Sequence, residues 1–280
     1  MKIYKQDISS LFFYCVGFSK IRNRFLRILN KKMATFITFH NIMPESFDNF
    51  KDNICFLKRH TNVVSLDDFF SANLSSKNIN VVITFDDGYK SWLTYAIPLL
   101  LEFGLPATFF IASGFVGLSK EKQAEFMRSR LLIPSGIRRN IKGLDFEDLR
   151  EIIKKGFTIG GHTLSHCNLK NLRNINQIRY EIGKDKIELE SETGVKIKYF
   201  AYPFGAYINP EIHLIGVLKE LGYEGAVTTV PGFNKTDSNP YLLYRDKTDA
   251  PMPRIMFKAK VFGNYGITHF IKKRVLGISL

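Results

Sequence analysis

The chain has 280 residues, of which 45% are hydrophobic, enough to bury the core of one large α/β domain or two small ones. Its formal net charge of +14 is compatible with nucleic acid, anionic lipid or an anionic glycan as a partner. Three scattered cysteines argue against a disulfide framework or a cysteine zinc knuckle, and they indicate thiols in a reducing compartment.

Strand patterns and helix patterns alternate along the chain. Residues 8–32 have apolar residues at helical spacing and a basic opposite face, which fits either a helix packed on the domain or attachment to a membrane surface. The strands predicted after this segment are 33–42, 63–66, 81–87, 107–112, 157–161, 198–202, 226–229 and 242–245. The predicted helices are 47–58, 67–72, 92–103, 145–155, 175–193 and 211–221. The polar, basic segment 119–142 is predicted to be an insertion or a helical excursion over one rim.

This alternation predicts an α/β fold with parallel strands joined by right-handed crossovers. About seven strand–helix units without an internal repeat favour one domain, and a barrel is among the arrangements that fit. The domain is predicted to cover residues 33–250. Residues 1–32 are predicted to be a basic amphipathic segment, and residues 251–280 a basic tail that packs on the domain.

The predicted strand 81–87 ends in two adjacent carboxylates, Asp86 and Asp87, followed by Gly88. Loops at the carboxyl ends of parallel strands form the ligand crevice of α/β proteins. Neighbours on a regular strand point to opposite faces, so the two acids can share a site only if the chain bends, which Gly88 permits. Two close carboxylates ionise at low cost only beside a cation. The stretch therefore predicts a metal site, with a helix N-cap as the alternative.

His162 and His166 follow the predicted strand 157–161 and are four residues apart, a spacing that would place both imidazoles on one face of a helical turn. Two histidines and one aspartate would leave a coordination position open for water, as catalytic zinc sites do. The other aspartate could then take a proton from that water. A lone pair of histidines is more often structural, and it is the two aspartates upstream that favour a metal centre. Cys167 is predicted to be a spectator.

Three motifs stand at the ends of predicted strands: TFDDG at 84–88, HTLSH at 162–166 and FAYPFG at 200–205. Together they resemble the first three motifs of the NodB-homology polysaccharide deacetylases, the carbohydrate esterase family four. The similarity runs from about residue 36 to residue 245. In addition, ITFHNI at 37–42 is similar to the histidine-bearing strand of one branch, the poly-N-acetylglucosamine deacetylases. The resemblance implies a distorted (β/α) barrel of about seven parallel strands and a metal-dependent N-deacetylase with a carbohydrate substrate.

By position, the resemblance assigns the general base to Asp86 and the metal ligands to Asp87, His162 and His166. This donor set suits zinc and also accepts cobalt, nickel or iron. The resemblance also places the backbone N–H of Phe204, after the motif proline, in the oxyanion hole, where a preorganised donor is needed. We further expect three neighbouring residues to contact the substrate: Tyr89, Tyr202 and Pro203.

The sequence departs from the family pattern in two places. Many members carry a base-orienting arginine two residues before the motif proline, and this chain has Ala201 there. Arg245 is the candidate replacement, with a surface salt bridge as the alternative. Many members also have a late Leu-x-His that protonates the leaving amine, and none follows Arg245 convincingly. His40 is therefore the candidate acid, although a histidine at a strand end is often structural. His269 lies in the basic tail and is expected to be peripheral.

These features predict a hydrolase that removes the N-acetyl group from an amino sugar of a glycan or a lipid-linked glycan precursor. The alternatives are a deformylase of a lipid-linked amino sugar and a non-catalytic glycan-binding domain of the same fold. Nucleic acid is an unlikely partner, because charge alone supports it and no binding motif is visible. The basic segments near both ends favour docking on anionic lipid. Together with the lack of a recognisable secretory signal or a bilayer-spanning run, they predict a cytoplasmic protein on the inner face of the membrane.

Overall fold

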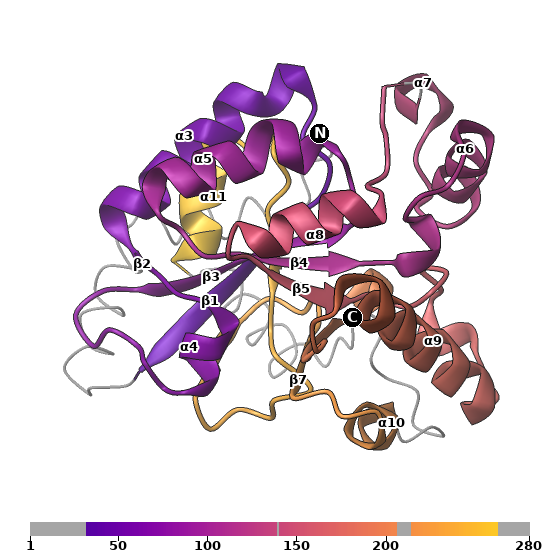
Figure 1. Cartoon of the computed structure of the whole chain (residues 1–280). Helices are drawn as coiled ribbons and strands as arrows, with labels where there is room; N and C mark the ends of the chain where they lie inside the picture. Colours follow the sequence, from indigo (N-terminus) through magenta and orange to yellow (C-terminus); the bar gives the residue numbers. More distant parts are fainter. Residues whose placement is uncertain (1–31, 139, 206–213, 263–280) are drawn as a thin grey trace, which may run out of the picture.

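The computed structural model of the chain describes residues 32–138, 140–205 and 214–262. Their strands form one curled sheet in the order β7-β6-β5-β4-β3-β1-β8 (Figure 1). The strands are β1 (Met33–Phe39), β2 (Asn62–Val63), β3 (Asn80–Asp87), β4 (Thr108–Ile111), β5 (Thr158–Gly161), β6 (Tyr199–Ala201), β7 (Gly225–Val227), β8 (Phe233–Lys235) and β9 (Asp246–Lys247). All pairs among these strands are parallel except β1 with β8. The α/β class and the distorted (β/α) barrel are confirmed.

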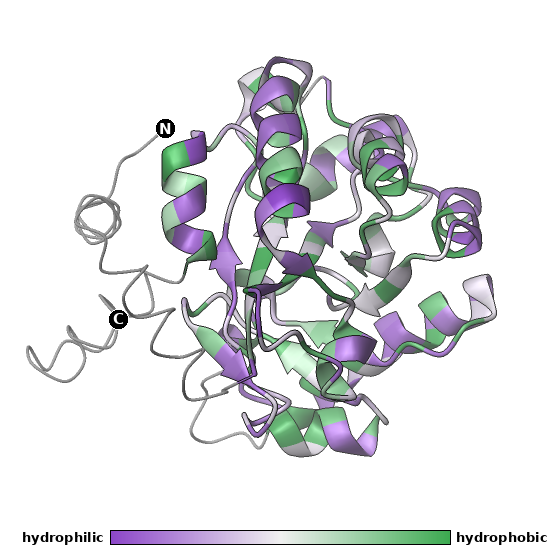
Figure 2. Cartoon of the chain, turned by 90° about the vertical axis from the view of Figure 1, so that its left-hand side faces the viewer, coloured by the Kyte–Doolittle hydropathy of each residue, from purple (hydrophilic) through white to green (hydrophobic). Residues whose placement is uncertain are grey.

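Helices connect the strands and cover the outside of the sheet (Figure 1). They are α3 (Phe47–His60), α4 (Leu66–Phe70), α5 (Ile97–Phe103), α6 (Lys120–Ser129), α7 (Ser135–Arg138), α8 (Phe146–Lys154), α9 (Ile175–Thr193), α10 (Leu214–Glu220) and α11 (Arg254–Val261). Figure 2 shows bands of hydrophobic and hydrophilic residues along these helices, as expected for elements with one side against a core. None of the helices in the described ranges is both long and apolar enough to cross a bilayer.

Local sequence signals set several helix boundaries. The Asp145 side chain accepts a hydrogen bond from the Asp148 N–H, and Asp148 returns one to the Asp145 N–H, both at 2.9 Å. This capping box starts α8 as predicted. The helix α5 ends at Gly104, whose φ of 62° is accessible to glycine at little cost. The segment 119–142 is a helical excursion that contains α6 and α7, as expected.

The strand β3 lies between β1 and β4, and all eight of its residues are buried. Its register places Asp87 level with Ile111 of β4, which is level with Gly161 of β5. Gly161 is in turn level with Phe200 of β6. Because these strands are parallel and in step, the three motifs that follow them meet at one edge of the sheet.

Two strand predictions need correction. The predicted strand 63–66 is only the pair Asn62–Val63, because Ser65 caps the start of α4 with its hydroxyl and turns the chain into a helix. The predicted strand 242–245 is an extended segment with a single bridge, Val227 with Leu243. The short antiparallel strand β8 was not predicted. Part of the predicted helix 211–221 lies outside the described residues, as do the N-terminal segment 1–31 and the tail beyond residue 262.

The segment 243–247 spans the space between the two edges of the curled sheet. Leu243 exchanges backbone hydrogen bonds with Ala226 and Thr228 beside β7, and β9 pairs with β1. Arg245 is fully buried in this segment and points to the carboxyl edge of β3. Asp246 follows it, also fully buried, and Lys260 of α11 is among the charges near it.

Asp246 gives a stability prediction. Neither carboxylate oxygen has a well-formed hydrogen bond among the described residues, and burial raises the pKa of Asp246 to about 6 from an ordinary 3.8. A raised acid pKa means that folding loses stability as the pH rises from about 4 through 6 and stays lower above it. Asp246→Asn should therefore gain about 3 kcal/mol over wild type at pH 8, with the gain shrinking toward pH 5. Urea unfolding across this pH range measures it, and a constant difference between the two proteins would contradict it.

Candidate active site

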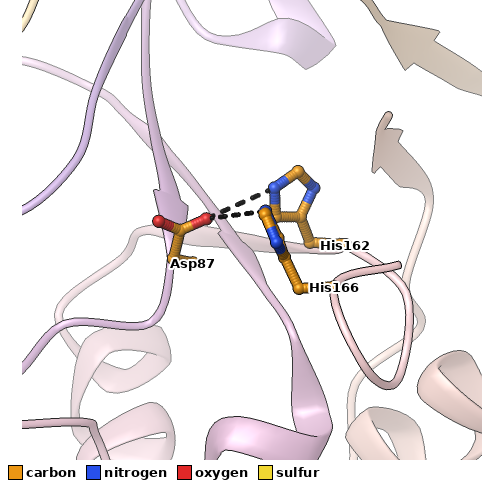
Figure 3. A group of neighbouring side chains, drawn as sticks. All are labelled: Asp87, His162 and His166. Atoms are coloured by element: carbon orange, nitrogen blue, oxygen red, sulfur yellow. Dashed lines mark ion pairs between the residues drawn. The ribbon is translucent and has the colours of Figure 1, made fainter. Parts of the chain in front are cut away.

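The end of β3 and the loop after β5 bring one carboxylate and two imidazoles together (Figure 3). The Nε2 atoms of His166 and His162 lie 3.2 and 3.5 Å from Asp87 Oδ1. One potential ligand atom from each of the three residues lies within 4.8 Å of the others, and all three side chains are buried. We call Asp87, His162 and His166 the metal triad.

The two histidines are not on a helical turn, contrary to the spacing argument. Thr163 and His166 have φ values of 62° and 50°, so the segment is a loop that reverses direction. The helix α9 holds this loop from outside. Asp185 accepts from the His162 N–H at 2.9 Å, and Glu181 accepts from the Ser165 N–H at 2.9 Å. Helix geometry would have placed the imidazoles similarly, which is why the residues were found although the local structure was wrong.

Close packing behind the loop depends on Gly161. A Cβ at this position would lie 2.7 Å from Asp185 Oδ2 and 2.5 Å from the Tyr223 hydroxyl. Glycine therefore lets the Asp185 carboxylate reach the His162 backbone. Burial raises the pKa of Asp185 to about 7, although its hydrogen bonds from the Ser113 and His162 N–H groups oppose this.

The remaining hydrogen bonds of the metal triad suit a divalent cation. The Nδ1 atoms of His162 and His166 lie 2.7 and 3.1 Å from the carbonyl oxygens of Ala201 and Arg130, so each Nδ1 donates and each Nε2 keeps its lone pair. Asp87 Oδ1 is buried without a hydrogen-bond partner, while Tyr89 donates to Oδ2 at 2.7 Å. A buried oxygen without a donor beside two imidazole lone pairs is a ligand set for a cation such as zinc.

Asp86 points to Arg245 on the other side of the carboxyl edge. Arg245 donates to both carboxylate oxygens, at 2.6 and 2.7 Å, and a third bond joins it to the Thr84 hydroxyl at 3.0 Å. Both side chains are buried, so this is not a surface salt bridge. Burial would raise the pKa of Asp86, but the guanidinium charge outweighs it and holds the pKa below the usual value. Asp86 is therefore an ionised, oriented carboxylate beside the metal triad.

His40 follows β1 and is half-buried. Its Nδ1 is 2.8 Å from Asp249 Oδ1, and its carbonyl accepts from the Trp92 indole at 3.0 Å. Burial works against the charged imidazole, but the Asp249 carboxylate outweighs it and raises the pKa of His40. This histidine is suited to hold and release a proton near neutral pH.

One open cleft of about 700 Å³ is lined by the metal triad together with Asp86, His40 and Asp249. Arg245 is not among the lining residues. Phe204 also lines the cleft, half-exposed, with its ring 4.8 Å from that of His166. Of the three residues predicted to contact the substrate, Tyr89 and Tyr202 line the cleft. Pro203 is buried and is not among the lining residues. The hydroxyl of Tyr202 donates to the Tyr241 carbonyl, and that of Tyr89 is used by Asp87. Both side chains are buried in the wall of the cleft.

Backbone strain is concentrated at this cleft. Six described residues other than glycine have a positive φ, and four belong to the site: Asp87, Thr163, His166 and Phe204. Such conformations cost about 1–3 kcal/mol each and cluster at functional sites. Asp87, with φ of 91°, supplies the bend that the sequence required for two adjacent acids to face one cleft, together with Gly88.

The model of the polysaccharide deacetylase family matches residues 74–226, which is more than half of the chain. The chain belongs to the polysaccharide deacetylase family. A curated relative, the putative polysaccharide deacetylase YxkH of Bacillus subtilis (strain 168), is 27% identical over 181 residues. The match covers 65% of this chain and 56% of YxkH, so this chain spans little more than half the length of that relative.

Two solved deacetylase structures share the fold. The deacetylase PplD of Streptococcus pyogenes, in complex with acetate, has a TM-score of 0.64 at 18% identity and covers 82% of this chain and 99% of its own. IcaB from Ammonifex degensii has a TM-score of 0.65 at 20% identity, with 82% and 97% covered. At this identity the likeness supports the barrel alone.

Sequence reasoning missed three supporting acids of this deacetylase-family site: Glu181, Asp185 and Asp249. Glu181 and Asp185 are four apart on α9, so an i, i+4 pair of acids on the buried side of a helix was the available signal. Asp249 sits in a loop without periodicity, and nothing local connects it to His40, 209 positions earlier. Cys167 is the expected spectator by its chemistry, because burial raises the pKa of its thiol to about 12.

Proposed function

We propose that this chain is a metal-dependent hydrolase that removes the N-acetyl group from an amino sugar of a glycan or a lipid-linked glycan precursor. The observation that carries this is one cleft in which the metal triad lies beside the buried, bidentate Asp86–Arg245 pair. An ionised carboxylate held next to a cation site is what hydrolysis of an unactivated amide needs.

The residues divide the work as follows. A divalent cation held by Asp87, His162 and His166 would polarise the amide carbonyl and acidify a water molecule. Asp86, fixed in orientation by Arg245, takes a proton from the attacking water. The Phe204 N–H donates to the developing oxyanion. His40 gives its proton to the departing amine, and acetate and a free amino sugar leave.

Acetate release from N-acetylated amino sugars tests this function. The metal-loaded protein should release acetate, lose activity with a chelator and recover with Zn²⁺, Co²⁺, Ni²⁺ or Fe²⁺. Asp87→Asn should lose both bound metal and activity, because it removes one of three ligands. Formate release from an N-formyl sugar without acetate release would instead indicate a deformylase. Bound metal without release of acetate or formate would indicate a non-catalytic glycan-binding domain.

The role of His40 predicts a pH effect. Asp249→Asn removes the carboxylate that raises the pKa of His40, so the imidazole should lose its proton at lower pH than in wild type. The alkaline limb of the pH–kcat profile should then move to lower pH. A profile that keeps its alkaline limb while only its height changes would assign Asp249 a structural role. Asp246→Asn shows the effect of the same substitution outside the cleft, and it should leave the alkaline limb at its wild-type pH.

Peripheral contact with anionic lipid and a cytoplasmic location are also proposals. They are supported by the net charge of +14 and the basic residues of segments 20–32 and 258–274. Most of these residues lie outside the described ranges.

A further inference from the structure

Residues 130–142, which we call the rim loop, connect α6 to the start of α8 and contain α7. Four aliphatic side chains of the rim loop line the active-site cleft: Leu131, Ile133, Ile137 and Ile141. The carbonyl of Arg130 holds the imidazole of His166. The rim loop is therefore fixed to the mouth of the cleft rather than to a distant surface. Figure 1 shows α6 and α7 standing out from the barrel on the side to which the β4 arrow points.

Leu132 lies in the rim loop between Leu131 and Ile133, which line the cleft, and it combines two unfavourable features. Its side chain is 66% exposed, the largest fraction among the large hydrophobic residues that the structure describes as exposed. Its φ is 55°, a conformation that a bulky residue adopts only with strain. Packing does not explain an exposed leucine in a strained turn. An outlier of this kind, directly beside an active site, points to a role outside the isolated molecule.

Other large apolar side chains beside Leu132 in sequence or in the cleft are exposed as well. Ile137 and Phe204, which line the cleft, are 45% and 47% exposed. Isolated exposed apolar residues are ordinary, but several around one opening mark a contact surface. Leu132 and Ile137 have no ring face for stacking on a sugar, so these two side chains suit an apolar phase better than a glycan chain.

The positive charge of the segment that contains these residues indicates an anionic partner. Residues 119–143 contain seven Lys or Arg and two Glu, a net charge of +5. Five of the basic side chains are exposed in the structure: Lys120, Lys122, Arg128, Arg130 and Lys142. Of these, Arg128 is paired with Glu125 on the same helix. Exposed apolar and basic side chains in one segment match the interface of an anionic bilayer, where apolar side chains enter between headgroups and basic ones meet lipid phosphates.

We propose that the rim loop docks the mouth of the cleft on an anionic lipid bilayer, with Leu132 and Ile137 entering the interface. The cleft would then open at the membrane surface, where an amino sugar attached to a lipid headgroup or lipid carrier is within its reach. Docking requires no turnover, so it stands or fails separately from the proposed deacetylation. It also differs from attachment through the basic ends of the chain, because the rim loop itself must enter the interface.

A tryptophan at position 132 reports this entry directly. The chain has one tryptophan, Trp92, which is fully buried and gives a constant background. The emission of Leu132→Trp should shift to the blue on vesicles of phosphatidylcholine with phosphatidylglycerol, and brominated phosphatidylglycerol should quench it. Ile187→Trp is the matched control, because Ile187 on α9 is 62% exposed and does not line the cleft. Its emission should not change.

Three results would overturn the proposal: no binding of the protein to these vesicles, binding without a change at position 132, or equal changes at positions 132 and 187. A second variant tests docking without an introduced tryptophan. Leu132→Asn deletes the apolar side chain and suits a positive φ better, so its urea midpoint should not fall. Its partition onto the same vesicles should weaken by about ten-fold. Partition equal to that of wild type would also overturn docking through Leu132.

Discussion

Asp86→Asn should lower kcat by about a thousand-fold, within the range of 10²–10⁴ that a positioned general base contributes. The carboxylate is buried, receives two hydrogen bonds from Arg245, and has a pKa below its usual value because of that charge. Asparagine keeps the shape but cannot accept a proton from water. Metal content and KM should change little, because Asp86 is not part of the metal triad. Initial rates of acetate release, with metal content measured on the same samples, test this.

The main alternative cause of lost activity is damage to the fold, because Asp86→Asn leaves the buried Arg245 without its counter-charge. Urea unfolding of Asp86→Asn measures that damage. Asp246→Asn makes the same change at a buried aspartate outside the cleft and shows whether loss of a buried carboxylate alone changes kcat. It should keep wild-type kcat. If Asp86→Asn retained more than a tenth of wild-type kcat with metal bound, the proton would have to go to another group.

The sequence was sufficient for those parts of the site that depend on local chemistry. The run of buried residues 81–85 followed by two acids located β3 and its carboxyl edge, because a fully buried parallel strand needs continuous apolar sequence. The alternation of strands and helices then placed His162 and His166 at the same edge. The positive φ values of Thr163 and His166 could not be predicted from the sequence. A β-branched threonine rarely adopts this conformation, and histidine adopts it only in a minority of cases.

The parts that failed depend on contacts between distant residues. The segment 242–245 has the composition of a strand, but its backbone hydrogen bonds are divided. Leu243 bonds beside β7, the Arg245 N–H donates to the Val230 carbonyl, and pairing with β1 begins only at Asp246. The partner of His40 could not be found because Asp249 is near it only after this segment spans the sheet edges. Arg245 was found only because the motif lacked an arginine at Ala201. The absence of an arginine at this position predicted that another basic residue orients Asp86. The structure shows Arg245 in contact with that carboxylate.

Arg245→Met should destabilise the chain by about 3–5 kcal/mol, because it leaves the buried carboxylate of Asp86 without a counter-charge. It also removes hydrogen bonds to Thr84 and to the Thr228 carbonyl. With Asp86 no longer held, kcat should fall about 100-fold, the cost expected of a displacement of about 1 Å. Urea unfolding and acetate release measure the two effects.

Two further variants separate charge from orientation. Arg245→Lys keeps the charge but cannot donate to both oxygens of Asp86 in a fork, so it should recover much of the stability and little of the kcat. The double variant Asp86→Asn/Arg245→Met removes both buried charges and should be more stable than either single variant, while remaining inactive. Wild-type kcat in Arg245→Lys would show that Arg245 supplies charge alone. Additive stability losses in the double variant would show that the pair is not coupled, and the bidentate contact would then have no part in holding the base.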